Sequence, residues 1–379
     1  MRILVTAGPM VGHLYPMVPF CWALRAAGHH VLVVAPDYFA PSILACGLPV
    51  ARVPTIDMST AMSRDRQGNP VPIDYYEPAR MRRSGRGWGR LAAHSLDGVR
   101  EVVVGWDPQA VVSDPLEMAG RLAAAERGIP WIEHGWGVRP SPYFHSGAAE
   151  ELVPELDRLA LASMPLPRLT LDVCPPDFQS PDSPPAQRMR YIPFSGPALR
   201  RERLATNGKP LVFVTFGTLL PRVNPEQAVG LLGELMRELT DGGFDFIIGV
   251  DPELLAHLRP YPAGARAVGR VPLDQVLPGC AGVVHYGNSG AMMTALANGV
   301  PQVVLAAQVA DAPDNAERVA ATGVGLRISA GDVTAEVVRE ACVRTITEPA
   351  YRARAEAFAA EMRKLPSPTE IALRLPDLL

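Results

Sequence analysis

The sequence predicts an α/β protein built from two doubly wound domains, each a parallel sheet with helices on both faces. The length of 379 residues suits two domains of ordinary size. A strand, a glycine-containing loop, a helix and a second strand follow one another over residues 3–35, and the same order begins again at Leu211. A proline-rich stretch over residues 165–197 separates the two repeats.

The N-terminal half opens with an apolar strand over residues 3–7, which ends at Gly8. Pro16 suits a first helical turn, and the apolar periodicity continues to Ala27 before a strand over residues 30–35. The other elements expected in this half are a strand over 110–113, a helix over 117–127 and a strand over 131–133.

The C-terminal half repeats this alternation, starting with a strand over residues 211–218. The other strands expected here are 244–250, 282–285 and 302–305. The expected helices are 227–240, 289–298 and 313–322. Ligands of such sheets bind outside the carboxyl ends of the strands, so we expect a ligand in a cleft that both domains face.

These elements predict the domain boundaries. We expect an N-terminal domain over 1–195, a linker over 196–210 and a C-terminal domain over 211–359, with a C-terminal helix at about 360–379 that packs back on the first domain. The prolines of residues 165–197 disfavour a regular helix or a central strand, so this stretch is expected to be an ordered wrap.

The composition excludes several classes of protein. It is 48% hydrophobic and 20% charged, which suits packed cores, and its net charge of −3 is too balanced for a dedicated nucleic-acid or membrane-surface binder. The five cysteines are scattered without a Cys-x-x-Cys pair, and no apolar stretch is long enough for a membrane span or a signal peptide. We expect a cytoplasmic protein with reduced thiols, and a homodimer is left open.

Two polar residues are expected at the carboxyl edge of the first sheet. His13 follows the first strand, and an imidazole can accept a proton near neutral pH. Asp114 ends the strand 110–113 and can orient His13 and stabilise its cation. Each residue also has a structural alternative, because His13 can bind backbone at a helix start and Asp114 can cap a helix before Pro115.

The segment 285–291, His-Tyr-Gly-Asn-Ser-Gly-Ala, joins a strand to a helix in the second half. Its glycines allow close backbone approach to a ligand, and the amides at a helix start favour anions. Gly217 and Thr218, at the end of the first strand of that half, add an amide and a hydroxyl. Together they make a candidate diphosphate cradle, although Asn288 or Ser289 can also serve as an ordinary helix cap.

Several nucleotide and metal motifs are missing from the sequence. It has no Gly-x-Gly-x-x-Gly after a strand with an acidic partner, no P-loop, no Asp-x-Asp and no His-Glu-x-x-His. The missing glycine motif disfavours a nicotinamide cofactor, and we expect no metal ion and no cofactor. Large apolar side chains are common in the N-terminal half, where some can line a pocket for a flat hydrophobic ligand. The candidates are Met10, Tyr15, Met58, His134 and Trp136.

The chain resembles the actinobacterial natural-product glycosyltransferases of the GT-B fold, which transfer deoxysugars from nucleotide donors to polyketide-type aglycones. The resemblance covers nearly the whole length. It is carried by the segment 285–291 and by seven other segments, at residues 12–16, 108–115, 172–176, 214–218, 271–274, 299–302 and 315–319.

The resemblance implies a role for individual residues. His13 matches the general base of that family and Asp114 its supporting carboxylate, while Asp311 matches the acid that touches sugar hydroxyls. The acceptor would bind the first domain and the nucleotide sugar the second. The donor-binding residues implied are Gly217, Thr218, Arg270, Val271, His285, Gly287, Asn288, Ser289, Gly290, Ala291 and Asp311.

The sequence departs from the family pattern at three places. The usual loop is His-His-Gly-Gly-Ala-Gly-Thr, so Ala291 lacks a hydroxyl. Asp311 is followed by Ala312 where glutamine is usual, which fits a donor with fewer hydroxyls, because an unpaired buried amide costs about 1–3 kcal/mol. Arg270 replaces a tryptophan that often stacks on the base, and a guanidinium can stack as well.

We therefore expect an inverting, metal-independent glycosyltransferase that uses a dTDP-deoxysugar and a hydrophobic aglycone, with His13 as the base. Two alternatives remain open at this point. One is a nucleotide-sugar epimerase of the same fold. The other is a catalytically silent partner protein, which the departures at Arg270, Ala291 and Ala312 keep in consideration.

Overall fold

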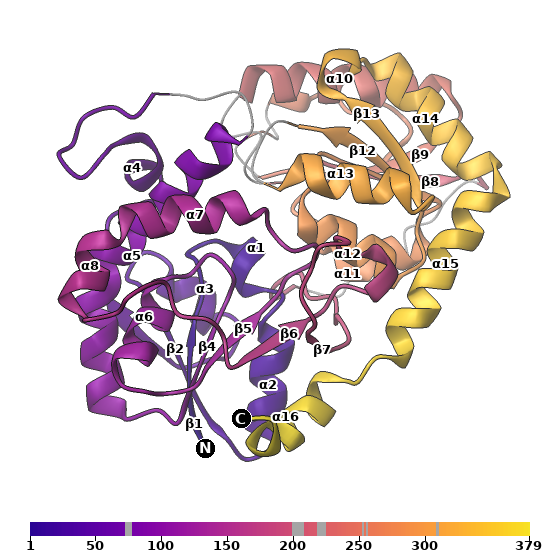
Figure 1. Cartoon of the computed structure of the whole chain (residues 1–379). Helices are drawn as coiled ribbons and strands as arrows, with labels where there is room; N and C mark the ends of the chain where they lie inside the picture. The colour runs from indigo at the N-terminus through magenta and orange to yellow at the C-terminus, as the bar shows by residue number, and fades with distance from the viewer. Residues whose placement is uncertain (73–77, 199–207, 218–224, 252–253, 255–256, 308–310) are drawn as a thin grey trace. The chain divides into compact units, whose positions relative to one another are not determined.

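The computed structural model describes residues 1–72, 78–198, 208–217, 225–251, 254, 257–307 and 311–379 (Figure 1). The chain forms two compact units. Unit 1 consists of Met1–Cys174, Asp182–Arg190 and Leu365–Leu379, and unit 2 consists of Pro175–Pro181 and Tyr191–Lys364. No helix among the described residues is long and apolar enough to cross a membrane.

Unit 1 contains a parallel sheet in the order β3-β2-β1-β4-β5-β6-β7. Its strands are β1 (Arg2–Thr6), β2 (His30–Pro36), β3 (Val50–Val53), β4 (Ala110–Ser113), β5 (Trp131–His134), β6 (Leu169–Asp172) and β7 (Gln187–Arg188). The strand order reverses between β1 and β4, where Thr6 is in register with Ser113. In doubly wound sheets this reversal leaves a crevice at the carboxyl ends of the strands.

The helices of unit 1 cover both faces of its sheet. They are α1 (Val11–Leu14), α2 (Val18–Ala26), α3 (Ala40–Leu44), α4 (Met58–Ser63), α5 (Ala79–Trp106), α6 (Ala119–Glu126), α7 (Pro142–Glu151), α8 (Val153–Arg158) and α16 (Pro368–Leu378). Buried side chains of α5 and α6 pack against Leu4, Val34 and Val111 of the strands. α16 packs on α2, and the His29 ring hydrogen-bonds the Ala372 carbonyl.

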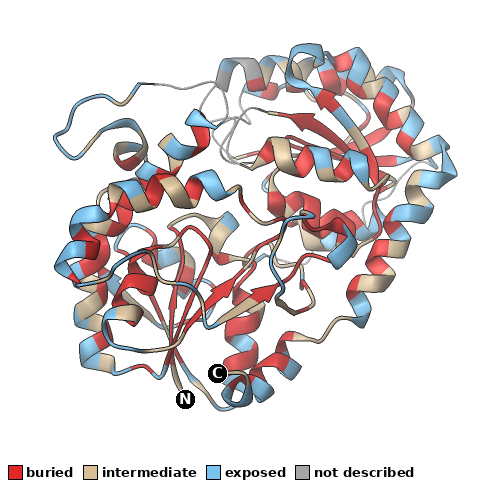
Figure 2. Ribbon diagram, viewed as in Figure 1, coloured by how far each residue is buried: buried red, intermediate tan, exposed pale blue. Residues whose placement is uncertain are grey.

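Unit 2 repeats the plan with a parallel sheet in the order β10-β9-β8-β11-β12-β13. Its strands are β8 (Leu211–Thr215), β9 (Asp245–Gly249), β10 (Ala265–Gly269), β11 (Gly282–His285), β12 (Gln302–Ala306) and β13 (Gly325–Ser329). The order reverses between β8 and β11, where Thr215 is in register with His285. Figure 2 shows the inner strands of this sheet as buried along most of their length, as expected for a sheet covered on both faces, and β8, β9, β11 and β12 are these strands.

The helices of unit 2 also lie on both faces of its sheet. They are α10 (Pro225–Asp241), α11 (Leu273–Val276), α12 (Ser289–Ala297), α13 (Ala312–Ala321), α14 (Ala335–Thr347) and α15 (Pro349–Lys364), with short 3₁₀ turns at Pro176–Phe178, Leu277–Gly279 and Ala330–Asp332. α10 and α14 contribute to the core on one face, and α11 and α12 to the core on the other. The predicted pair of doubly wound domains is thus confirmed.

The long helix α5 was not predicted from the sequence. It contains three glycines near its start, which normally weaken a helix. Here they allow close packing: a Cβ atom on Gly85 would lie 2.1 Å from the Phe144 carbonyl oxygen of α7, and one on Gly147 would lie 2.0 Å from that of Arg82. The two helices approach through these glycines, so tertiary packing outweighs the low intrinsic helix propensity.

The proline-rich stretch differs from the expectation in two ways. It contains β6 and β7, which extend the sheet of unit 1, because the prolines lie between the strands and leave Leu169–Asp172 able to pair on both sides. Pro175–Pro181 belongs to unit 2, although residues up to 195 were assigned to the first domain. At the C-terminus, where a helix was expected from about residue 360, the chain enters unit 1 at Leu365, after α15.

Candidate active site

The structure brings His13 and Asp114 together at the strand-order reversal of unit 1. β1 and β4 are neighbours, so the segments that follow them leave the sheet at the same edge. His13 Nδ1 lies 3.1 Å from Asp114 Oδ1. The Nε2 atom of His13 has no hydrogen-bond partner among the described residues, and 12% of the side chain is exposed. One ring nitrogen is therefore held by a carboxylate while the other is available for proton transfer.

Asp114 is fully buried and is held as a carboxylate. Burial alone would raise its pKa, but the charge and hydrogen bond of His13 and the backbone amides of Gly8 and Leu116 outweigh this and lower the pKa below its usual value. The Gly8 amide donates to Oδ2 at 2.6 Å and the Leu116 amide to Oδ1 at 2.8 Å. This carboxylate can orient the imidazole and stabilise an imidazolium.

Two tryptophans flank the His13 ring. The ring centroid of Trp88, on α5, lies 4.7 Å from that of His13, and the centroid of Trp136, just after β5, lies 4.5 Å away. Trp136 was predicted to contact the acceptor. Trp88 was not among the predicted site residues, and its place beside His13 depends on α5, which was not predicted either.

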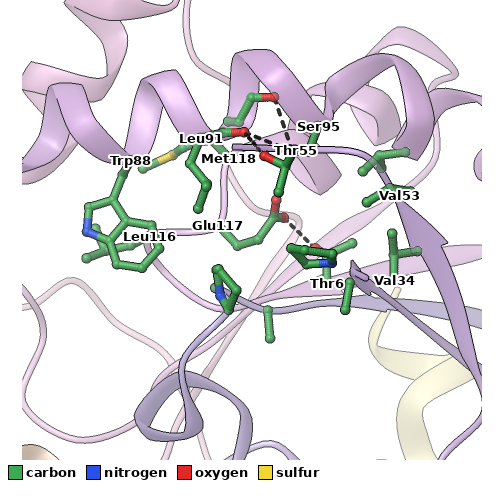
Figure 3. A pocket seen from close by; sticks show the side chains of 17 residues that line it. Thr6, Val34, Val53, Thr55, Trp88, Leu91, Ser95, Leu116, Glu117 and Met118 are labelled. Carbon is green, nitrogen blue, oxygen red and sulfur yellow. Dashed lines mark hydrogen bonds between the residues drawn. The ribbon is translucent and has the colours of Figure 1, made fainter. Parts of the chain in front are cut away.

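A small cavity lies beside this site, between the sheet edge and α5 (Figure 3). Its volume of about 30 Å³ leaves room for one or two water molecules. The lining is mostly apolar, with the carboxyl group of Glu117 at one side. Burial raises the pKa of Glu117, against hydrogen bonds from Thr6 and from the Gly120 amide. The Glu117 carboxylate also accepts from the Ala119 amide, so it caps the start of α6.

The other predicted acceptor residues differ in their surroundings. Met10 and Met58 are partly buried and pack against the core of unit 1, and Tyr15 follows α1. His134 is completely buried at the end of β5, where its Nδ1 donates to the Gly135 carbonyl at 2.7 Å and burial lowers its pKa to about 4. Acceptor contacts of these residues stay predictions, and His134 contributes to the core in this conformation.

His285 is the last residue of β11, at the strand-order reversal of unit 2. Its side chain is completely buried, with Nε2 2.9 Å from Gln302 Oε1, and its Nδ1 accepts from the Gly287 amide at 3.1 Å. Burial lowers the pKa of His285 to about 4, although the hydrogen bond to Gln302 opposes this shift. The ring is therefore neutral near pH 7, and it fixes the loop that follows. A direct contact of His285 with a diphosphate stays a prediction.

A side-chain network joins the loop after β11 to the start of α13. Ser289 Oγ donates to Asp311 Oδ2 at 2.6 Å. The buried Asn315 donates from Nδ2 to the Gly287 carbonyl at 2.7 Å, and its Nδ2 also lies 3.0 Å from Ser289 Oγ and 3.1 Å from Asp311 Oδ2. Asn315 and Gln302 were noted only within longer motifs. Asn315 lies four positions after Asp311 on α13, a spacing that could have pointed to it.

The start of α12 is suited to an anion. Asn288 is its N-cap residue, and its side chain makes no capping hydrogen bond, so among the described residues the first-turn amides have no side-chain cap. A Cβ atom on Gly290 would meet nothing within 4 Å, whereas one on Gly287, at a φ of 102°, would lie 2.7 Å from the Ala312 carbonyl oxygen. Gly287 is thus required by close packing, and Gly290 has open space beside it.

The remaining predicted donor residues differ in burial and in backbone conformation. Gly217 adopts a φ of 60° and packs under the Tyr286 ring, and Ala291 is buried within α12. Arg270 is exposed after β10, with Val271 mostly buried beside it. Thr218 lies outside the described residues. No three His, Cys, Asp or Glu side chains of the described chain come together as a metal site, and metal independence stays a prediction.

Solved structures with this arrangement define the class of protein. The Streptomyces sp. SF2575 glycosyltransferase SsfS6, in complex with thymidine diphosphate, superimposes with a TM-score of 0.88, is 35% identical and covers 100% of both chains. The spinosyn rhamnosyltransferase SpnG, in complex with spinosyn aglycone, gives a TM-score of 0.84 at 28% identity, over 99% of this chain and 100% of its own. The protein is a glycosyltransferase of the GT-B fold.

Sequence comparison places the chain more closely. It matches the family model described as "Erythromycin biosynthesis protein CIII-like" in both parts, the N-terminal domain over residues 22–217 and the C-terminal domain over 233–378. The L-demethylnoviosyl transferase of Streptomyces niveus is 36% identical over 98% of this chain and 97% of its own length. The chain belongs to this family of actinobacterial natural-product glycosyltransferases, and the resemblance inferred from the sequence is confirmed.

Proposed function

We propose that this protein transfers a deoxysugar from a dTDP-sugar to a hydroxyl group of a hydrophobic polyketide-type aglycone, with inversion at the anomeric carbon and without a metal ion or other cofactor. The observation that carries the proposal is the His13–Asp114 pair, in which one ring nitrogen contacts a buried carboxylate and the other has no partner among the described residues.

In the proposed reaction, His13 Nε2 accepts the proton of the acceptor hydroxyl as its oxygen attacks the anomeric carbon. The bond from that carbon to the diphosphate oxygen breaks on the opposite face, and the diphosphate leaves with the electron pair. Asp114 keeps the proton on Nδ1, so that Nε2 presents its lone pair, and stabilises the imidazolium that forms. Such general-base catalysis contributes about 10²–10⁴-fold.

The donor site is proposed at the start of α12. Its first-turn amides favour the charge that develops on the leaving diphosphate, and Gly290 leaves space for close approach. His285 holds the segment before α12 through its hydrogen bond with the Gly287 amide. Asp311, which accepts from Ser289 next to this helix start, is the residue proposed to bind sugar hydroxyls. The thymidine diphosphate bound in SsfS6 supports a dTDP donor, and the relatives that transfer deoxysugars, such as the desosaminyltransferase of Streptomyces venezuelae, support the sugar class.

The acceptor is proposed to bind unit 1 beside His13. The aglycone complex of SpnG supports a hydrophobic acceptor. The cavity of about 30 Å³ is far smaller than common ligand pockets of about 300–1,000 Å³, so it does not hold the acceptor.

The proposal is tested with dTDP-L-rhamnose and dTDP-glucose against a panel of phenolic aglycones, with products identified by mass spectrometry. His13→Ala should keep the calorimetric affinity for dTDP and lose transfer by about 10²–10⁴-fold. Nearly full turnover in that variant would remove His13 as the base. A wild-type protein that fails to bind dTDP would instead indicate a silent partner, and release of an epimerised donor without transfer would indicate an epimerase.

A further inference from the structure

The His13 ring contacts two indoles as well as the Asp114 carboxylate. Trp88 and Trp136 lie at centroid distances of 4.7 and 4.5 Å, with interplanar angles of 37° and 55°. Both indoles are only 6% exposed, so each is fixed by the core around it. They come from α5 and from the segment after β5, and they meet the same imidazole from separate parts of unit 1.

Gly8 completes this enclosure. A Cβ atom at this position would lie 2.8 Å from Trp88 Cζ3 and 3.0 Å from His13 Nδ1, so only glycine lets the indole and the imidazole approach the backbone this closely. The Gly8 amide meanwhile donates to Asp114 Oδ2. One residue therefore accommodates the imidazole, one of its flanking indoles and the carboxylate that binds it.

We propose that Trp88 and Trp136 are positioning residues for the general base, which hold the imidazole plane and stabilise its cation through their π faces. This inference rests on the proposed function, because it assumes that His13 takes the acceptor proton. The Asp114 hydrogen bond fixes the direction of Nδ1 but leaves rotation about that bond, and the two indoles restrict it. Nε2 then keeps one direction for the incoming hydroxyl.

The electrostatic part follows from the proton balance. The proton leaves the acceptor oxygen and adds to Nε2, the electron pair of the O–H bond stays on oxygen, and the imidazole becomes a cation. A cation near an indole face is attracted by the ring quadrupole, more strongly where water is excluded. The attraction acts on the imidazolium and hardly on the neutral ring, so it favours the proton-transfer state over the resting state.

Fluorinated tryptophan, incorporated at position 88 or 136 alone, tests this without changing shape. Fluorine withdraws electron density from the indole face, so kcat should fall stepwise from mono- to trifluorotryptophan, by about three- to tenfold in total. The KM for the dTDP-sugar and the melting temperature should stay constant. The same substitution at Trp131, a buried indole that faces Arg121 at 4.2 Å, is the matched control and should leave kcat unchanged.

A second pair of variants separates position from charge. Trp88→Phe should retain more kcat than Trp88→Leu, because the phenyl ring keeps an aromatic face. A kcat that is flat across the fluorinated series, combined with a loss in Trp88→Leu, would overturn the electrostatic role. A kcat equal to wild type in both leucine variants, Trp88→Leu and Trp136→Leu, would overturn the proposal as a whole.

A measurement without substrate separates this inference from the proposed function. The ¹⁹F resonance of 5-fluorotryptophan at position 88 should change its chemical shift in His13→Gln, because the imidazole packs against this indole. His94→Gln, at an exposed position on the same helix, is the matched control and should leave the resonance in place. A resonance that is unchanged in His13→Gln overturns the inference. A His13-dependent resonance together with full turnover in His13→Ala overturns the proposed function, and with it the catalytic role of the two tryptophans, while their packing against His13 stands.

Discussion

His13 and His285 both lie at the reversal of strand order of their sheet, and their hydrogen bonds differ. Each lies at the carboxyl edge next to the reversal of strand order, β1–β4 in unit 1 and β8–β11 in unit 2. His13 pairs with a carboxylate and keeps a partly exposed ring with one nitrogen that has no partner among the described residues. His285 pairs with the amide of Gln302, is completely buried and has both nitrogens bonded.

The hydrogen-bond partner and the burial of a histidine at this edge of the sheet therefore decide whether its ring can take up a proton. A buried carboxylate beside an imidazole stabilises its cation, whereas an amide in a dry site does not compensate for the lost hydration of a cation. The first arrangement suits proton transfer. The second suits the fixing of a loop, and the low pKa of His285 follows from its burial.

The largest expected effect comes from making the first pair resemble the second. Asp114→Asn should lower transfer by about 10²–10⁴-fold, because a neutral amide does not stabilise the imidazolium that forms on proton transfer. The free energy of unfolding should also fall by about 1–3 kcal/mol. If the asparagine oxygen takes the place of Asp114 Oδ1, its amide nitrogen takes the place of Oδ2 and cannot accept the hydrogen bond of the Gly8 amide. Turnover numbers and urea unfolding measure the two effects.

Asp172→Asn is the matched control for that substitution. Asp172 is a mostly buried carboxylate at the end of β6, where it binds the Cys174 amide and Arg188. Its replacement should cost stability and leave the turnover of the folded protein intact. Equal losses of turnover in the two variants would show that Asp114 acts only through the fold.

Gln302→Glu makes the second pair resemble the first. It should lower the free energy of unfolding by an amount that depends on pH. In wild type the neutral His285 has a pKa of about 4, below the ~6.5 of an unfolded chain, so its contribution to stability is present above pH 6.5 and is lost as the pH falls toward 4. The buried carboxylate that the substitution introduces would favour the imidazolium. The variant should be less stable than wild type by about 3 kcal/mol at pH 8, with a gap that narrows toward pH 6.

Urea unfolding between pH 8 and pH 5 measures this gap. Gln302→Met removes the hydrogen bond without adding a charge, so its deficit should be similar at pH 8 and pH 7. A Gln302→Glu deficit that does not change with pH would mean that His285 stays neutral beside a carboxylate, and the comparison of the two histidines would lose its basis.

The smallest effect is expected from Asn315→Ala, which removes support under the donor loop. The Gly287 carbonyl loses a hydrogen bond from a buried donor, at a cost of about 1–3 kcal/mol. Affinity for dTDP should weaken by about three- to tenfold as the loop loosens, which calorimetry measures. Asn298→Ala, at the other end of α12, removes one partly buried hydrogen bond and should leave dTDP affinity unchanged. A similar loss in both variants would contradict a specific role of Asn315.

The repeated strand and helix pattern predicts most of both sheets, because parallel strands buried on both faces appear as continuous apolar runs. The expected edges placed His13, Asp114 and the segment 285–291 where the structure has them. The helix α5 was missed because its glycines are explained only by elements distant in sequence, chiefly α4 and α7. The burial of His285 was also missed, since Gln302 lies on the next strand and no local pattern reveals which ring nitrogen it meets.

The last helix, α16, adds a constraint on how the chain is made. It belongs to unit 1, where it packs on α2, yet it is synthesised after all of unit 2. During translation the surface of α2 therefore stays uncovered, and unit 1 incomplete, until Leu365–Leu379 emerge from the ribosome. Unit 1 is thus the first unit whose synthesis starts and the last whose residues are all synthesised. All residues of unit 2 are synthesised by Lys364, before the last segment of unit 1.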